Sequence, residues 1–280
     1  MKKALIVEGG GFKTGFTSGI LDAFIVAKFN PFSHYLGVSG GSVAISYFMS
    51  QQYRYCVEAM KILAKDKNFT SYKRTFGKEG YMDIDFLLNV AGEKVPFNIA
   101  DAIKNGKEKD VRFIATSKLT GEADYLKPND TNWLDCVIAS CTLPYVTKGQ
   151  HTVNGQVYFD GGWSDALPVK WAYINGCKHI LVLRTWPKDT RSSQSWADYF
   201  GSKYFNDSPK LSQAIANSYA KYNESLDFIA NPPRDLTIEQ ITPKKLLKSG
   251  VYTYSNKTIM SDYRYGLDRG MMYLKNNQHD

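Results

Sequence analysis

A serine flanked by glycines is the feature of this sequence that most directly indicates chemistry. Gly37-Val38-Ser39-Gly40-Gly41 has the G-x-S-x-G spacing that places a serine on a sharp turn between a strand and a helix. Glycines leave room at such a turn, where a Cβ would clash. A short apolar segment precedes this pentapeptide and a helical pattern of apolar residues follows it. The pentapeptide therefore predicts that Ser39 is a nucleophile.

The nucleophile needs a base, because a serine hydroxyl is unreactive until its proton is removed. In one hypothesis Asp160, on the turn Asp160-Gly161-Gly162, is the only partner of Ser39. Such a dyad requires a partly desolvated aspartate and an oxyanion hole. In the alternative, His179 completes a Ser-Asp-His triad in the chain order of α/β-hydrolases. We favour the dyad, because His179 opens an apolar strand, where a histidine more often caps or packs.

A second glycine-rich turn, Gly9-Gly10-Gly11, follows an apolar run and precedes an amphipathic helical pattern. A strand, a glycine turn and a helix in this order present backbone N–H groups to an anion. That anion is either the oxyanion of an acyl-transfer reaction or a phosphate. In the second case the chain is a nucleotide- or lipid-binding protein in which Ser39 does no chemistry. The nucleotide hypothesis is weaker, because the sequence has neither the third glycine of a dinucleotide fingerprint nor a P-loop Gly-Lys-Ser/Thr.

Composition limits the class of protein and its partners. A chain of 280 residues, 43% hydrophobic and 22% charged, can bury a large core in one domain or two closely joined ones. The net charge of +8 favours anionic partners, but its lysines and arginines form no long run. We therefore expect a basic surface that can touch an anionic membrane, and no nucleic acid. The oligomeric state stays open.

The cysteines and the apolar segments indicate the compartment. The four cysteines show no C-x-x-C spacing and no cluster with histidine, so neither a zinc site nor a disulfide framework is expected; they are Cys56, Cys136, Cys141 and Cys177. The apolar run near the N-terminus is too short for a signal peptide, and no segment approaches the about eighteen apolar residues of a membrane span. We expect a cytoplasmic protein, with peripheral binding at the inner face of the membrane, that uses no metal or cofactor.

Strands alternate with helices over the first 185 residues, which is typical of a largely parallel sheet covered on both faces. The predicted strands span residues 3–7, 33–38, 111–117, 119–126, 157–159 and 179–183, and a helix is predicted over 133–141. Beyond Arg184 the chain reads as helices, with one strand near 236–241. We predict a catalytic domain at 1–185 and a mainly helical region at 186–280 that packs on the core or acts as a lid.

Four segments together resemble the bacterial patatin-like phospholipase family. They are E-G-G-G-F-K at Glu8–Lys13, G-V-S-G-G at Gly37–Gly41, A-S-C-T-L-P at Ala139–Pro144 and D-G-G-W-S-D-A-L-P at Asp160–Pro168. The resemblance covers roughly residues 3–185. It implies a three-layer α/β/α sandwich with a mostly parallel central sheet. It also implies a serine lipid acyl hydrolase of the phospholipase A type that uses a Ser-Asp dyad without histidine.

Carried over by position, Ser39 is similar to the family's nucleophile and Asp160 to its general base. The backbone N–H groups of Gly10, Gly11 and Phe12 would then bind the oxyanion. The resemblance thus implies cleavage of phospholipid or related acyl esters through an acyl-serine intermediate.

A lysine and a threonine, Lys13 and Thr14, follow the glycine turn and Phe12. Lys13 takes the place of the family's usual arginine or lysine. The family commonly has glycine directly after it, whereas this sequence has Thr14. Either the turn tolerates a side chain at this position or the helix starts differently.

Overall fold

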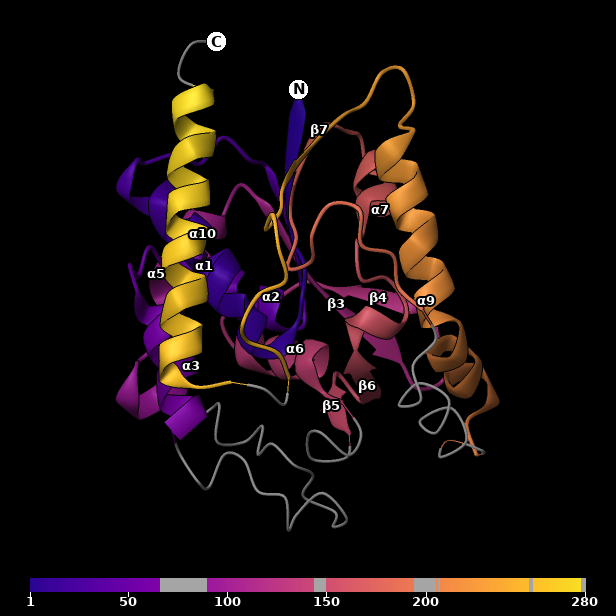
Figure 1. The fold of residues 1–280 in the computed structure, drawn as a ribbon. Helices are drawn as coiled ribbons and strands as arrows, with labels where there is room; N and C mark the ends of the chain where they lie inside the picture. Colours follow the sequence, from indigo (N-terminus) through magenta and orange to yellow (C-terminus); the bar gives the residue numbers. More distant parts are fainter. Residues whose placement is uncertain (66–89, 144–149, 194–204, 206, 252–253, 278–280) are drawn as a thin grey trace.

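The computed structural model describes residues 1–65, 90–143, 150–193, 205, 207–251 and 254–277. One mixed sheet runs through the centre, with helices on both of its faces (Figure 1). The predicted α/β sandwich with a mostly parallel central sheet and a mainly helical C-terminal region is confirmed. Pro144 of the A-S-C-T-L-P segment lies outside the described residues.

Within the described residues the sheet has eight strands, whose hydrogen-bonded neighbours follow the order β5-β6-β3-β2-β1-β7-β8, with β4 also paired to β3. Strands β3, β2, β1, β7 and β8 are parallel, whereas β4, β5 and β6 form antiparallel pairs. The strands are β1 (Lys2–Val7), β2 (His34–Val38), β3 (Asp110–Ser117), β4 (Ala123–Leu126), β5 (His151–Val153), β6 (Gln156–Asp160), β7 (Cys177–Leu183) and β8 (Thr237–Ile241).

Helices cover the sheet in two layers (Figure 1). The longer helices are α1 (Thr14–Val26), α2 (Gly40–Met49), α3 (Tyr55–Lys65), α5 (Ile99–Gly106), α6 (Trp133–Cys141), α7 (Val169–Ile174), α9 (Pro209–Ala230) and α10 (Asn256–Asn276). Shorter turns are η1 (Gly11–Lys13), η3 (Val90–Lys94) and η4 (Gly161–Trp163). The bounds of α6 are those predicted.

The apolar run of β1 explains the two layers. Successive side chains of a strand point to opposite faces of the sheet. Leu5 and Val7 accordingly join the core that contains α1, α2, α6 and α10. Ala4 and Ile6 join the core beneath α7 and α9. A strand buried on both faces is continuously apolar, which is why this run predicts a central parallel strand.

Two β-hairpin features differ from the prediction. The predicted strand at 119–126 begins only at Ala123, because Gly121 donates its N–H to the Ser117 carbonyl in a tight turn. Strand β5 was not predicted at all. It pairs with β6 through Asn154-Gly155, both with positive φ, which is the two-residue turn that favours a hairpin.

The chain after the predicted boundary at residue 185 contributes to the sheet and to both layers. Strand β8 pairs in parallel with β7. Helix α9 lies over one face of the sheet, and α10 runs along α1 on the other (Figure 1). The approach of α10 to α1 is close, since a Cβ added at Gly266 would lie 1.9 Å from the carbonyl oxygen of Phe16.

Candidate active site

Ser39 occupies the turn between β2 and α2. Its φ of 53° and ψ of −129° fall in a region that residues with a Cβ rarely adopt. The backbone N–H of Ser39 donates to Ser140 Oγ at 2.9 Å, which ties the turn to α6. A Cβ added at Gly41 would lie 2.1 Å from the Val7 carbonyl oxygen, so only glycine fits there. Ser39 thus stands at the N-terminus of α2, in the strand-turn-helix context that the pentapeptide predicts.

The pairing of β3 explains how Asp160 comes close to Ser39. Strand β4 occupies one edge of β3, while β2 and β6 follow one another along the other edge. Val38 pairs with Ile114, and Asp160 pairs with the next residue, Ala115. Ser39 directly follows Val38. Two residues 121 positions apart in the chain therefore meet where β2 and β6 abut.

Hydrogen bonds fix both the backbone of Asp160 and one oxygen of its carboxyl group. Its backbone N–H donates to the Thr142 carbonyl at 2.7 Å, and its carbonyl accepts from Thr116 Oγ1 at 2.7 Å. Side-chain Oδ1 accepts the Gly162 N–H at 2.8 Å. Oδ2 is buried and has no hydrogen-bond partner among the described residues. One carboxylate oxygen is thus fixed, and the other remains available.

Burial determines the protonation of this carboxyl group. Asp160 is 4% exposed, and desolvation raises its pKa to about 6, against the opposing effects of the Ser39 side chain and the Gly162 N–H. Ser39 is therefore close enough to influence the carboxyl group, although Oδ2 lacks a well-aligned hydrogen bond. Such bonds are often poorly aligned in proteins without bound substrate. The Cys141 thiol lies beside the same pair, and burial and the Asp160 charge raise its pKa.

The glycine turn touches the serine. A Cβ added at Gly9 would lie 2.7 Å from Ser39 Cβ and 3.5 Å from Ser39 Oγ. Gly10 and Gly11 have φ of 143° and 57°, values that glycine adopts without strain. Phe12 is buried and packs on Tyr254, with ring centroids 4.0 Å apart. Gly9 thus lies next to the serine side chain, and the backbone of Gly10–Phe12, where the resemblance implies oxyanion donors, follows it directly.

Thr14 is the first residue of α1, and its position explains the departure from the usual glycine. A Cβ added at Gly40 would lie 2.0 Å from Thr14 Oγ1. The threonine side chain therefore fits because the serine turn has a glycine opposite it. The turn thus tolerates a side chain at position 14, and the helix begins at this residue.

Lys13 lies against Trp186, with Nζ 3.0 Å from the ring centroid, a cation–π contact. Burial lowers the pKa of Lys13 to about 8, while the nearby charges of Glu8 and Asp262 oppose this shift. The lysine is thus largely charged at neutral pH and lies two residues after the glycine turn.

His179 is not part of this site, and the alternative triad is wrong. His179 of β7 pairs with Lys3 of β1, and the register of β1 with β2 places Lys3 level with Ser33. His179 therefore lies about six residues before Ser39 along the strand direction. At ~3.3 Å per residue the separation is roughly 20 Å. His179 Nε2 instead contacts Glu239 Oε1 at 2.6 Å on the far end of the sheet.

Several residues that support the site were not predicted as site residues. Ser140 contacts both Ser39 N and Ser42 Oγ, each at 2.9 Å. Ser140 lies in the A-S-C-T-L-P segment, so that motif could have indicated a residue near the site. Thr116 lies near the end of β3 and Thr185 lies two residues after β7, and no local sequence pattern marks either residue.

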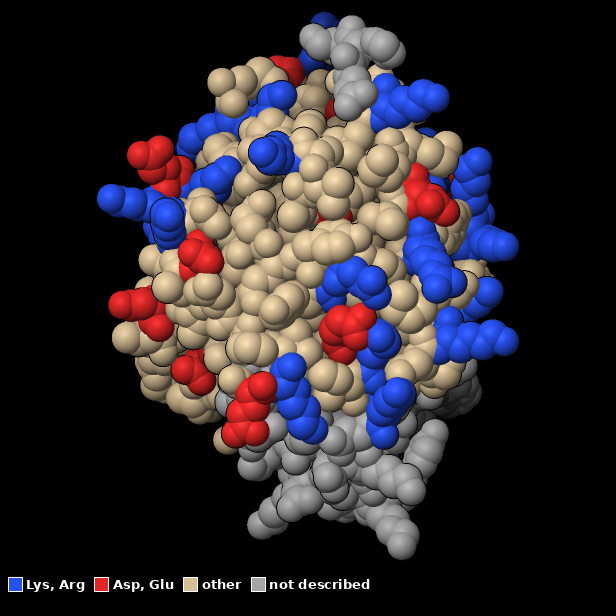
Figure 2. All heavy atoms as spheres, turned by 90° about the vertical axis from the view of Figure 1, so that its left-hand side faces the viewer, with Lys and Arg blue, Asp and Glu red and all other residues tan. Residues whose placement is uncertain are grey.

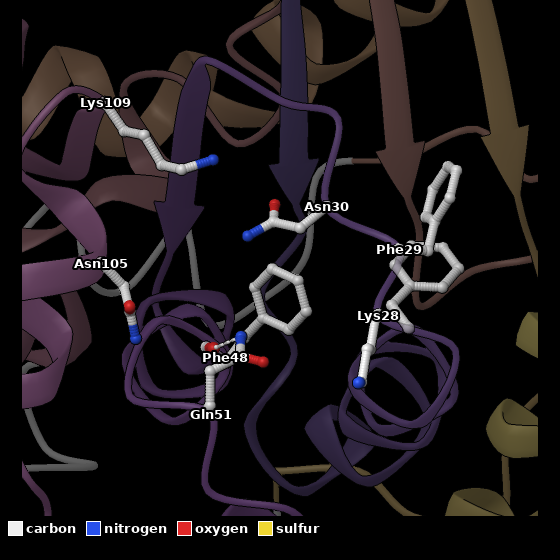
Figure 3. Close-up of a pocket in the computed structure, with 8 residues that line it drawn as sticks. Lys28, Phe29, Asn30, Phe48, Gln51, Asn105 and Lys109 are labelled. Carbon is white, nitrogen blue, oxygen red and sulfur yellow. Dashed lines mark hydrogen bonds between the residues drawn. The ribbon is translucent and has the colours of Figure 1, made fainter.

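In the described part of the chain, no three side chains of the metal-binding types are grouped to hold an ion, and no helix is long and apolar enough to cross a bilayer. A pocket of about 250 Å³ opens at the far end of α2 (Figure 3). It is lined by Phe24, Lys28, Phe29, Asn30, Phe48, Gln51, Asn105 and Lys109. The ten-residue α2 separates it from Ser39 by ~15 Å, so this pocket is distinct from the candidate active site.

Comparison with known proteins defines the class. A sequence model of the patatin-like phospholipase family matches residues 5–173, more than half of the chain, so the protein belongs to this family of lipid acyl hydrolases. Residues 208–279 match a second model, described as a domain of unknown function (DUF6363). Uncharacterized protein YjjU of Escherichia coli K12 is 30% identical over 274 residues, which cover 97% of this chain and 76% of YjjU. The crystal structure of VipD from Legionella pneumophila is similar with a TM-score of 0.45 and 13% identity, covering 98% of this chain and 67% of VipD.

Proposed function

We propose that the protein is a serine lipid acyl hydrolase of the phospholipase A type, which cleaves phospholipid or related acyl esters through an acyl-Ser39 intermediate. The observation that carries this proposal is the meeting of three groups at neighbouring strand ends. They are the serine in its strained turn, the buried Asp160 carboxyl with one free oxygen, and the Gly9–Gly11 turn, whose Gly9 lies against the serine side chain.

The chemistry follows from these positions. Asp160, with its pKa near 6, is mostly ionised at neutral pH and accepts the Ser39 proton as Oγ attacks the ester carbonyl carbon. The backbone N–H groups of Gly10, Gly11 and Phe12, with the N-terminus of α2, stabilise the negative oxygen that forms. Asp160 then delivers the proton to the leaving alkoxide as the C–O bond breaks. A water molecule loses a proton to Asp160 and attacks the acyl group, and the fatty acid leaves as Ser39 regains its proton.

A fluorophosphonate probe tests this proposal, because it reacts only with an activated serine. Wild type, Ser39→Ala, Asp160→Asn and His179→Ala would be labelled, the adduct located by peptide mass spectrometry, and turnover of short-chain p-nitrophenyl esters followed. We expect an adduct on Ser39 that is weakened in Asp160→Asn and persists in His179→Ala. The labelling rate should rise as the pH passes through about 6, because Asp160 loses its proton there.

Two outcomes would count against the dyad. Undiminished labelling of Asp160→Asn would remove Asp160 from the role of base. If folded wild-type protein gave neither adduct nor turnover with lipid present, the hydrolase proposal would fail, and a binding protein would become the better hypothesis.

We also propose that the basic surface recruits the protein to anionic bilayers. The net charge of +8 supports this, and lysine and arginine side chains surround the α10 face, interspersed with acidic ones (Figure 2). Sedimentation with anionic vesicles at low salt should exceed sedimentation with neutral vesicles and should fall as salt is added. Equal binding to both kinds of vesicle would contradict it.

A further inference from the structure

Glu8, directly before the glycine turn, is a carboxylate buried to 4% exposure. A buried charge is unfavourable unless hydrogen bonds compensate it. Oε1 accepts from Tyr222 Oη at 2.6 Å, and Oε2 accepts from the backbone N–H of Thr185. Burial raises the pKa of Glu8, and both of these donors, together with the Arg184 charge, oppose that shift. Glu8 therefore joins the end of β7 and helix α9 to the start of the glycine turn.

Thr185 carries this connection into the turn itself. Its Oγ1 lies 2.7 Å from the Gly9 carbonyl oxygen and 3.2 Å from Glu8 Oε2. The hydroxyl has one proton, and the shorter distance favours its donation to the Gly9 carbonyl. A Cβ added at Gly10 would lie 2.9 Å from the same Oγ1. The threonine hydroxyl thus holds one glycine by a hydrogen bond and packs against the next.

Tyr222 brings the C-terminal segment into contact with this network. It lies on α9, outside the segment that matches the patatin-like family and inside the segment of unknown function. Its hydroxyl donates to Glu8 and accepts from Arg184 Nη2 at 3.1 Å. Arg184 is itself 1% exposed and donates to the Lys188 carbonyl at 2.9 Å. The tyrosine hydroxyl is thereby fixed from both sides.

We propose that Tyr222 and Thr185 are positioning residues for the glycine turn, which they hold through Glu8 and Gly9 so that its backbone N–H groups face the substrate carbonyl. This inference rests on the proposed hydrolase function. Oxyanion donors are effective only when they are already oriented before the reaction, and small misplacements lower the rate. The segment at 208–279 thereby acquires a role in the reaction as well as in packing.

Tyr222→Phe tests this role, and Tyr263→Phe is its matched control. Tyr263 also lies in the C-terminal segment and donates to a carboxylate of the N-terminal part, Asp22 Oδ2 at 2.9 Å, but on α1 rather than at the turn. With a short-chain ester, Tyr222→Phe should lower kcat by about 10-fold and leave KM unchanged, because the donors act in the transition state. Tyr263→Phe should keep the wild-type kcat, whatever stability either variant loses.

Thr185 supplies a second pair of variants that does not depend on α9. Thr185→Val removes the hydroxyl that binds Gly9 and should lower kcat, whereas Thr185→Ser keeps it and should restore kcat. Wild-type kcat in both Tyr222→Phe and Thr185→Val would overturn the proposal, and so would a rise in KM at constant kcat. Ser39→Ala in the same assay separates the two failures. Turnover that survives Ser39→Ala overturns the hydrolase itself, while turnover that is lost there leaves the positioning role to be judged on its own variants.

Discussion

Among the individual residues, Asp160 combines deep burial with a raised pKa, and this combination has a consequence for stability. Its pKa lies near 6 in the folded protein and at 3.8 in an ordinary aspartate. Folding therefore favours the protonated carboxyl. Its contribution to stability is present below about pH 4 and is lost as the pH rises through about 6. A shift of about two units corresponds to on the order of 3 kcal/mol.

Asp160→Asn should accordingly abolish activity and stabilise the fold at neutral pH. We expect the free energy of unfolding of the variant to exceed that of wild type at pH 8, by up to about 3 kcal/mol, and to approach it at pH 4. Urea unfolding at the two pH values measures the difference. Asp235→Asn is a control with the opposite sign, because the Lys178 hydrogen bond lowers the pKa of that exposed carboxyl, whereas burial raises the pKa of Asp160. An equal difference between wild type and Asp160→Asn at both pH values would contradict the argument.

Between elements, the start of α1 and the serine turn fit together through one pair of residues. Thr14 stands where the family usually has glycine. Gly40 is the second variable position of the G-x-S-x-G motif, and here it has no side chain. The space that a Cβ at position 40 would need is filled by Thr14 Oγ1. The two positions should therefore be coupled.

Gly40→Ala alone should lower both stability and turnover, since overpacking costs about 1–3 kcal/mol. Thr14→Ala should rescue it, because the clashing oxygen is removed. Thr14→Ser should not, because Oγ1 is retained. Thermal unfolding and ester turnover of the single and double variants form a double-mutant cycle, and additive effects would show that the two residues are independent.

In the molecule as a whole, the C-terminal region completes the fold as well as contacting the site. Strand β8 extends the sheet, α9 covers one face, and α10 lies in close contact with α1 on the other. The contact with α1 depends on Gly266, where an added Cβ would meet the Phe16 carbonyl oxygen. A backbone atom cannot move aside as a flexible side chain can.

Gly266→Ala should therefore destabilise the whole chain by about 1–3 kcal/mol or more, in a single unfolding transition. Gly106→Ala is the matched control in a helix, because its Cβ would have no neighbour closer than 3.6 Å. It should be neutral or stabilising by up to about 1 kcal/mol. Urea unfolding compares the two, and equal stability of both variants would show that the α1–α10 contact is not tight.

The sequence by itself determined the local structure and its chemistry. The apolar run of β1, the serine turn and the bounds of α6 were predictable, because each depends on the conformational preferences of a few neighbouring residues. The Asn154-Gly155 hairpin could have been recognised in the same way. Even the residue types of the site, a serine between glycines and an aspartate before glycines, were readable in single short segments.

Only the tertiary structure decided which of these residues meet. The register of β2 and β6 on β3 brings Asp160 to Ser39, and the parallel register of β1 and β7 carries His179 to the opposite end of the sheet. The hydrogen bond from Tyr222 to Glu8 spans 214 positions, and the sequence near either residue does not predict it. Local sequence encodes backbone conformation, whereas contacts between distant segments arise from strand pairing and packing, which no short segment contains.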